Sequence, residues 1–265
     1  MTFESAKNIL VIIVSLVSVF QVFAVLENIS LLRGQAYRGS TIKAHYPPLL
    51  RQLLPFLFQD RAFQALLYFA LVTNVLVALM ASFPGWFFDS RLILVQLFFL
   101  WMQILRFRGG LNGGSDFFAF HLQIGLAIGL CLTQEQAPKA GLAYIALVTS
   151  LSYFRAGVGK ALKKKWWQGE ALAELLKTSP FADVSSKEIH SQWLKIISAI
   201  TILAQLLFPF SLILPEALMY GFFAFCFGMH LMNWWILGLH RFLLYWPLGY
   251  IAVWAINLEI LKFVS

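Results

Sequence analysis

One lysine marks the stretch of this sequence whose residue types could do chemistry. Lys160 stands where an apolar run gives way to polar sequence, and Arg155 lies five residues before it in the same run. A charge at membrane depth is costly, so it should face protein or water and have a partner. Gly157 and Gly159 leave room for a neighbouring helix or a ligand to come close. The alternative is a lysine that only extends to the headgroups at a helix end. The spacing alone does not distinguish a lysine with a partner at a site from a lysine that extends to the headgroups.

A phosphate-binding loop is excluded at this place. Gly157-x-Gly159-Lys160 has the glycines and lysine of such a loop, but Phe154 occupies a required glycine position. Ala161 replaces the Ser or Thr that would bind magnesium. Arg155 lies about 140° from Lys160 around a helix, so the spacing does not make it the group that tunes the lysine.

The composition shows what kind of scaffold must position these residues. Of 265 residues, 60% are hydrophobic and only 12% are charged, whereas soluble domains carry about a quarter charged residues. Cys131 and Cys226 both lie in apolar runs and are interpreted as buried thiols. The net charge of +8 is concentrated in loops, which favours anionic lipid headgroups as partners and disfavours nucleic acid.

Eight apolar runs are long enough to be membrane helices, which need about 20 residues. We therefore predict an all-α, polytopic integral membrane bundle of about eight transmembrane helices, forming one domain over residues 1–265. Gly125 and Gly129, four residues apart, predict a close contact between two helices. The predicted spans are Asn8–Leu26, Ala62–Phe83, Trp86–Leu105, Asp116–Leu132, Ala140–Val158, Trp193–Leu214, Glu216–Leu237 and Phe242–Phe263.

Two long basic connections are predicted to contain interfacial helices. The basic loop 27–61 includes Leu49–Phe58, where apolar and polar residues alternate. The lysine loop 153–192 includes Lys163-Lys164-Lys165, then Trp166, Trp167 and the amphipathic Glu170–Leu176. These loops fall on the side opposite the termini, so the positive-inside rule places them in the cytoplasm.

Three patches resemble a known membrane family. The first joins Ala156-Gly157-Val158-Gly159-Lys160 to Trp166 or Trp167 and then Gly169-x-Ala171-Leu172. The second is Leu111-Asn112-Gly113-Gly114-Ser115-Asp116, and the third is Gly228-Met229-His230. Together they resemble the vitamin K-dependent γ-carboxylase-like domain, also called the horizontally transferred transmembrane (HTTM) domain, in a short bacterial-type member.

The resemblance implies a role for each matching residue. Lys160 corresponds to the base that deprotonates reduced vitamin K, so a quinone is the implied cofactor. The chemistry needs a neutral amine, although an ordinary lysine has a pKa of about 10.4. Substrate binding is implied for residues in the three patches and beside them: Arg155, Gly157, Gly159, Trp166, Trp167, Asn112, Asp116 and His230.

The chain departs from the carboxylases because it lacks their luminal domain, and one extra residue separates Lys160 from the first tryptophan. The sequence therefore leaves two functions open. One is a lyase- or carboxylase-like membrane enzyme acting on a quinone-, lipid- or peptide-type substrate. The other is a non-catalytic subunit that supports maturation or export of a peptide with a membrane or peptide partner protein.

A third alternative is a haem protein in which two histidines from facing helices bind iron. His121 and His230 lie within apolar runs, but no two histidines have the helical spacing of a ligand pair, and no metal ligand is assigned.

The resemblance to bacterial members implies a multi-pass protein of the bacterial inner membrane. It also places the lysine loop on the outer face, opposite to the charge count, and the two remain alternatives.

Overall fold

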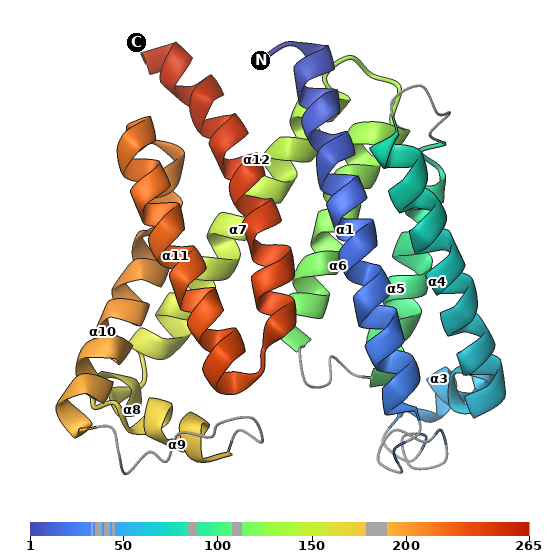
Figure 1. Ribbon diagram of the computed structural model, residues 1–265, viewed down its shortest axis with the longest axis horizontal. Coiled ribbons are helices and arrows are strands. Elements are labelled where there is room, and N and C mark those ends of the chain that lie inside the picture. Colours follow the sequence, from blue (N-terminus) through green and yellow to red (C-terminus); the bar gives the residue numbers. More distant parts are fainter. Residues whose placement is uncertain are drawn as a thin grey trace. The chain divides into compact units, whose positions relative to one another are not determined.

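The computed structural model describes residues 1–32, 34, 39, 43, 46–83, 89–107, 113–178 and 190–264. Every secondary-structure element in these ranges is a helix, which confirms the predicted all-α class. The chain divides into two compact units, each described by itself (Figure 1). We call Thr2–Gly141 the N-terminal unit and Leu142–Ser265, with Met1, the C-terminal unit. The single domain expected over residues 1–265 stays a prediction.

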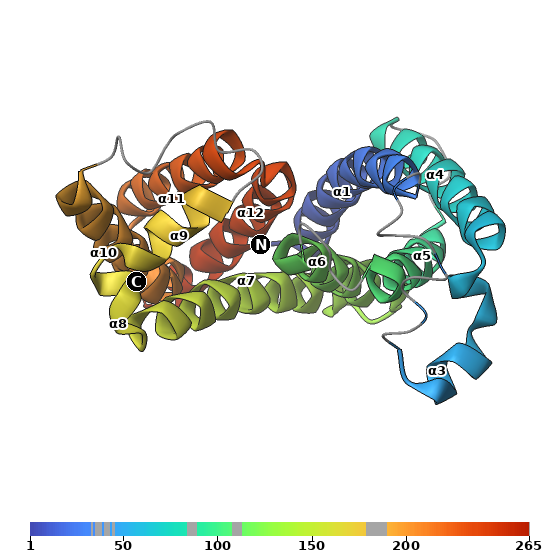
Figure 2. The same cartoon turned by 90° about the horizontal axis from the view of Figure 1, so that it is seen from below.

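The N-terminal unit is built on four long helices, with two short ones before the second. In both views α1 lies beside α4 and α6, and α5 packs between α4 and α6 (Figures 1 and 2). The Thr2 hydroxyl begins α1 by accepting a hydrogen bond of 3.2 Å from the Ser5 amide. The elements are α1 (Phe3–Leu31), α3 (Pro48–Leu53), the 3-10 helix η2 (Pro55–Phe58), α4 (Asp60–Ser82), α5 (Leu92–Phe107) and α6 (Gly113–Cys131).

The C-terminal unit contains most of α7, which begins at the end of the N-terminal unit. After α7 come two short helices, then α10 continued by η3, and then the pair α11 and α12, which is joined by a tight turn (Figure 1). Gly238 makes that turn at φ 68°, a left-handed conformation that glycine adopts without strain. The elements are α7 (Ala137–Ala161), α8 (Lys164–Trp167), α9 (Glu170–Thr178), α10 (Ser191–Leu207), the 3-10 helix η3 (Phe208–Leu212), α11 (Glu216–Leu237) and α12 (His240–Val264).

Each of the eight predicted apolar runs is a helix in the described residues. Six helices there are long and apolar enough to cross a membrane, so the chain is a multi-pass membrane protein: α1, α4, α6, α7, α10 continued by η3, and α12. Helix α11 is not among the six; Glu216, His230 and Asn233 lower its hydropathy.

The third predicted span, Trp86–Leu105, is wrong at its start, because α5 begins at Leu92 and has 16 residues. Residues 84–88 lie outside the described part. Asp89 sets the observed start: its carboxylate accepts a 3.0 Å hydrogen bond from the Arg91 amide, and its carbonyl accepts from the Leu92 amide. A side chain that caps amide groups in this way begins a helix even inside an apolar region.

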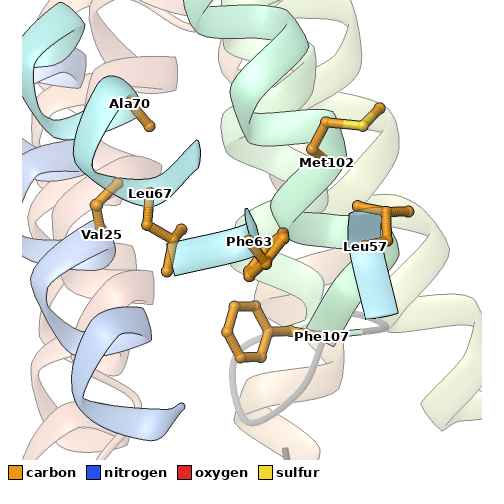
Figure 3. Packing of buried hydrophobic residues seen from close by; sticks show 7 residues of the cluster. All are labelled: Val25, Leu57, Phe63, Leu67, Ala70, Met102 and Phe107. Carbon is orange, nitrogen blue, oxygen red and sulfur yellow. The ribbon is translucent and has the colours of Figure 1, made fainter. Parts of the chain in front are cut away.

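A hydrophobic cluster holds α1, α4, α5 and η2 together in the N-terminal unit. Figure 3 shows Phe63 and Phe107 facing each other, and their rings lie edge to face with centroids 5.8 Å apart. The other members are Val25, Leu57, Leu67, Ala70 and Met102, all buried. Burial of such side chains is worth about 1.5–3 kcal/mol each in water, and within a membrane close packing supplies the attraction.

The predicted contact at Gly125 and Gly129 is confirmed. A Cβ atom on Gly141 would lie 2.5 Å from the Gly125 carbonyl oxygen and 2.8 Å from the Gly129 Cα. The end of α6 and the start of α7 therefore approach so closely that only glycine fits at 141. Both basic loops contain the expected helices, as α3 with η2 and as α8 with α9.

Candidate functional site

The candidate site lies on one stripe of α7. Tyr153, Gly157 and Lys160 are spaced by four and then three residues, so they lie on the same face of the helix. This face packs against α10 and η3. A Cβ atom on Gly157 would lie 2.9 Å from the Leu206 amide nitrogen and 3.1 Å from the Gln205 carbonyl carbon. The glycine therefore allows α7 and α10 to touch backbone to backbone.

Lys160 is held at the end of this stripe. Its Nζ donates a 3.0 Å hydrogen bond to Gln205 Oε1 on α10 and lies 5.1 Å from the centre of the Trp166 ring. A third contact, 3.5 Å to the Ala156 carbonyl, stays within its own helix. Lys160 is half-buried. An amide oxygen and an aromatic face both favour the charged ammonium.

No carboxylate in the described part of the chain pairs with Lys160. The exposed ion pair nearby joins Lys165 to Glu174 at 3.2 Å, both on the α8–α9 side. The described contacts of Lys160 are an amide oxygen, a backbone carbonyl and a ring, and none of them carries a negative charge that would compensate an ammonium group. Lys160 can therefore attract an anion or an acidic hydroxyl group that reaches it.

A buried hydrogen-bonded triad lies two turns before Lys160. The Tyr153 hydroxyl is 2.5 Å from His230 Nε2 on α11 and also contacts the Tyr250 hydroxyl on α12. The three residues are 2%, 6% and 6% exposed, so they are closed off from solvent. Because one phenol oxygen serves both neighbours, the triad ties α7, α11 and α12 to one another.

Aromatic rings surround the triad. Phe208 of η3 stacks on Tyr153 with ring centres 3.9 Å apart and planes 5° apart. Trp246 meets Tyr153 edge to face at 4.7 Å and lies nearly parallel to the His230 ring at 5.4 Å. Phe223 stacks on Tyr250 at 4.9 Å. The rings supply large apolar area and fix the polar groups in one geometry.

The structure brings together some of the predicted site residues. Gly157, Lys160 and Trp166 meet at the α7–α10 contact, and His230 joins the triad in the same unit. The binding roles of these four residues stay predictions.

The other predicted residues lie elsewhere. Arg155 is exposed, and nothing lies within 4 Å of where a Cβ on Gly159 would be. Trp167 is also exposed, and its Nε1 donates to the Ala161 carbonyl at 2.8 Å. Asp116 belongs to α6 in the N-terminal unit, and Asn112 lies outside the described residues.

Sequence reasoning missed Gln205, Phe208, Trp246 and Tyr250. Tyr153 began the stretch that drew attention, but it was not selected as a site residue. Its distance of seven residues from Lys160, two helical turns, is the signal that would have found it. Cys226 and His230, four residues apart on α11, give a similar signal, because both are buried on the triad side.

Comparison with models of protein families finds no match. Comparison with curated proteins finds none either, and the same holds for solved structures. The site is therefore interpreted from its own geometry.

The geometry bears on metal and haem binding. In the described residues, no group of three or more His, Cys, Asp or Glu side chains could hold a metal ion. His230 Nε2 is engaged by Tyr153, so a haem iron could bind this atom only after that hydrogen bond is broken. The arrangement is suited to holding a polar or anionic group at Lys160.

Proposed function

We propose that this chain is a membrane-embedded protein of the HTTM type that binds the acidic or anionic head of a quinone-, lipid- or peptide-type ligand at Lys160. One observation carries the proposal: the half-buried ammonium is held by Gln205 and Trp166, with no carboxylate partner in the described residues. The three sequence patches around Lys160, Asp116 and His230 support the family. By the same resemblance, the bacterial inner membrane is the proposed location.

The contacts of Lys160 bear on its two possible roles. As a cation, it can hold a carboxylate, phosphate or ionised hydroxyl group directly. As a base, it must first lose its proton, and both Gln205 and the Trp166 ring stabilise the protonated form. We therefore propose binding as the primary role and proton abstraction as a step that requires the ligand to displace Gln205.

The surroundings suit an amphipathic ligand. Lys163, Lys164, Lys165 and Trp167 follow directly and are exposed, as is typical of residues at the headgroup level. Anionic headgroups are the proposed partners of these lysines. The ligand's head would lie at Lys160 and its apolar part against the exposed apolar side chains of the helices.

The test is a binding titration with the purified protein in mild detergent. The probes are a naphthoquinone, its reduced hydroquinone and a long-chain fatty acid, each followed by quenching of tryptophan fluorescence. We expect Lys160→Met to weaken binding of the acidic probes about tenfold or more, as loss of a charge-assisted hydrogen bond implies. Lys195→Met, which removes an exposed lysine of α10, is the matched control and should leave binding unchanged.

Two results would decide against the proposal. Equal affinities for the Lys160→Met variant and its parent would remove the binding role. Loss of folding in Lys160→Met, with Lys160→Arg restoring the fold but not binding of any probe, would make the lysine structural. In either case a stoichiometric partner recovered in mild detergent would favour the non-catalytic subunit.

A further inference from the structure

A network of uncharged polar side chains lies buried in the N-terminal unit, away from the Lys160 site. Gln96 of α5 is its centre: Nε2 donates to Ser18 Oγ of α1 at 2.8 Å and to Asn74 Oδ1 of α4 at 2.7 Å. Its Oε1 accepts from Gln123 Nε2 of α6 at 3.3 Å. All four residues are at most 1% exposed. Four membrane-type helices thus meet through hydrogen bonds in an apolar interior.

Two buried amide atoms, one in the network and one a helical turn from it along α1, have no hydrogen-bond partner among the described residues. Gln123 Oε1 is buried and has no hydrogen-bond partner among the described residues. Gln21 lies one turn after Ser18 on α1, is 3% exposed, and its Nε2 is also without a partner in that part of the chain. An unmatched buried amide is destabilising, and in the interior of a membrane no water is present to form the missing hydrogen bond. Each of the two unmatched atoms therefore indicates a bound group that completes its hydrogen bonding.

The hydrogen-bonding character of the two unmatched amide atoms indicates what kind of group would complete them. Gln21 offers a donor and Gln123 offers an acceptor, and none of the five side chains carries a charge. An anion would be repelled at the Gln123 oxygen, and a cation at the Gln21 N–H groups. A hydroxyl group both accepts and donates, so it matches either atom, and it would still match if the amides were turned over.

We propose that the core of the N-terminal unit binds uncharged hydroxyl groups as guests at these two buried amides, one that accepts from Gln21 and one that donates to Gln123. The same chemistry has two sources: a buried water, or the head of an amphipathic alcohol from the membrane. Buried waters typically make two to four hydrogen bonds to polar groups that the chain leaves open. Neither the guests nor their sites depend on Lys160.

The direction in which Gln21→Met changes the melting temperature tests the proposal. Gln21→Met replaces the amide by an apolar side chain of similar length. If a guest is bound to Gln21, the variant loses that hydrogen bond, and Tm of the purified protein falls by about 2–4 °C. If the amide is truly unmatched, removing it relieves a cost, and Tm stays the same or rises, which would overturn the proposal. Gln64→Met, an exposed glutamine of the same unit, is the control and should shift Tm little.

If Gln21→Met does not fold, a density map of the unaltered protein tests the proposal instead, and native mass spectrometry distinguishes a buried water from an amphipathic alcohol. A density map of the unaltered protein at a resolution that shows waters should contain a feature at Gln21 Nε2 and Gln123 Oε1. Protein-only packing around both atoms would overturn the proposal. Native mass spectrometry then identifies the source: an added mass that Gln21→Met loses indicates an amphipathic alcohol, and density without added mass indicates water.

Discussion

The two units each bury a cation, and they neutralise it in different ways. In the N-terminal unit, Arg106 is fully buried and its Nη2 lies 2.5 Å from Asp60 Oδ1, while the Phe63 ring lies 5.2 Å from the guanidinium. In the C-terminal unit, Lys160 is half-buried and has an amide oxygen and a ring, but no carboxylate in the described residues. A cation paired inside the chain has little charge left for a ligand, whereas one held by neutral groups keeps it. The comparison assigns Arg106 to the fold and makes Lys160 the candidate for binding.

The polar interiors differ as well. The N-terminal unit joins its helices through amides and a hydroxyl, while the C-terminal unit does so through two phenols and an imidazole packed among rings. Amides have no proton that titrates in water, whereas phenols and imidazole do, so the two interiors differ in the kind of side chain that joins their helices.

The largest effect should follow from breaking the arginine pair. Asp60→Asn removes the carboxylate that the structure pairs with Arg106, and the buried guanidinium keeps its charge. We expect a loss of about 3 kcal/mol in the free energy of unfolding, because a buried charge that loses its partner is strongly destabilising. Thermal unfolding in detergent measures it. A loss no greater than that of Asp89→Asn, which breaks an exposed pair, would show that Arg106 does not depend on Asp60, and the contrast with Lys160 would be lost.

A smaller effect should follow from removing one hydroxyl in the triad. Tyr153→Phe keeps the ring that stacks on Phe208 but takes the shared hydrogen bond from His230 and Tyr250. A loss of about 1–3 kcal/mol is expected, since two buried polar groups lose a partner. Phe154→Leu, at the exposed neighbouring position, is the control. An unchanged Tm for Tyr153→Phe would mean that the rings alone hold α7 to α11 and α12.

The smallest effect concerns an exposed pair at the start of α5. Hydrogen bonds from the Arg91 side chain and amide lower the pKa of Asp89 from its ordinary value of 3.8. Because the folded pKa is depressed, the ionised carboxylate stabilises the fold above that value, and the contribution is lost as pH falls below it. Asp89→Asn should therefore lower Tm at pH 7 by about 1 °C or less, and the difference should vanish at acid pH. A larger difference at acid pH than at pH 7 would contradict this assignment.

The sequence predicted the helices well because hydropathy is a local property of each run. Runs such as Ala62–Phe83 and Ala140–Val158 correspond to α4 and α7 within a few residues at either end. The start of α5 was missed because it depends on one local hydrogen bond at Asp89, which the mean hydropathy of the run does not detect. Glycines spaced by four residues correctly indicated a close helix contact, since only the absence of a side chain permits it.

The partners at the site could not be predicted in the same way. Gln205 lies 45 residues after Lys160, and Tyr250 lies 97 residues after Tyr153. Hydropathy does not say which helices pack together or how they are rotated. Arg155 was a natural candidate because it is charged and near in sequence. It is nevertheless exposed on another face, since five residues are well short of two full turns.

Gly157 has a consequence for the route by which a molecule could reach Lys160. One turn before the lysine, the backbones of α7 and α10 touch and leave no passage along their seam. A ligand that bound Lys160 as proposed could therefore not reach the amine between the two helices at Gly157, and any side chain larger than glycine at position 157 would push α10 away from the helix that carries the lysine.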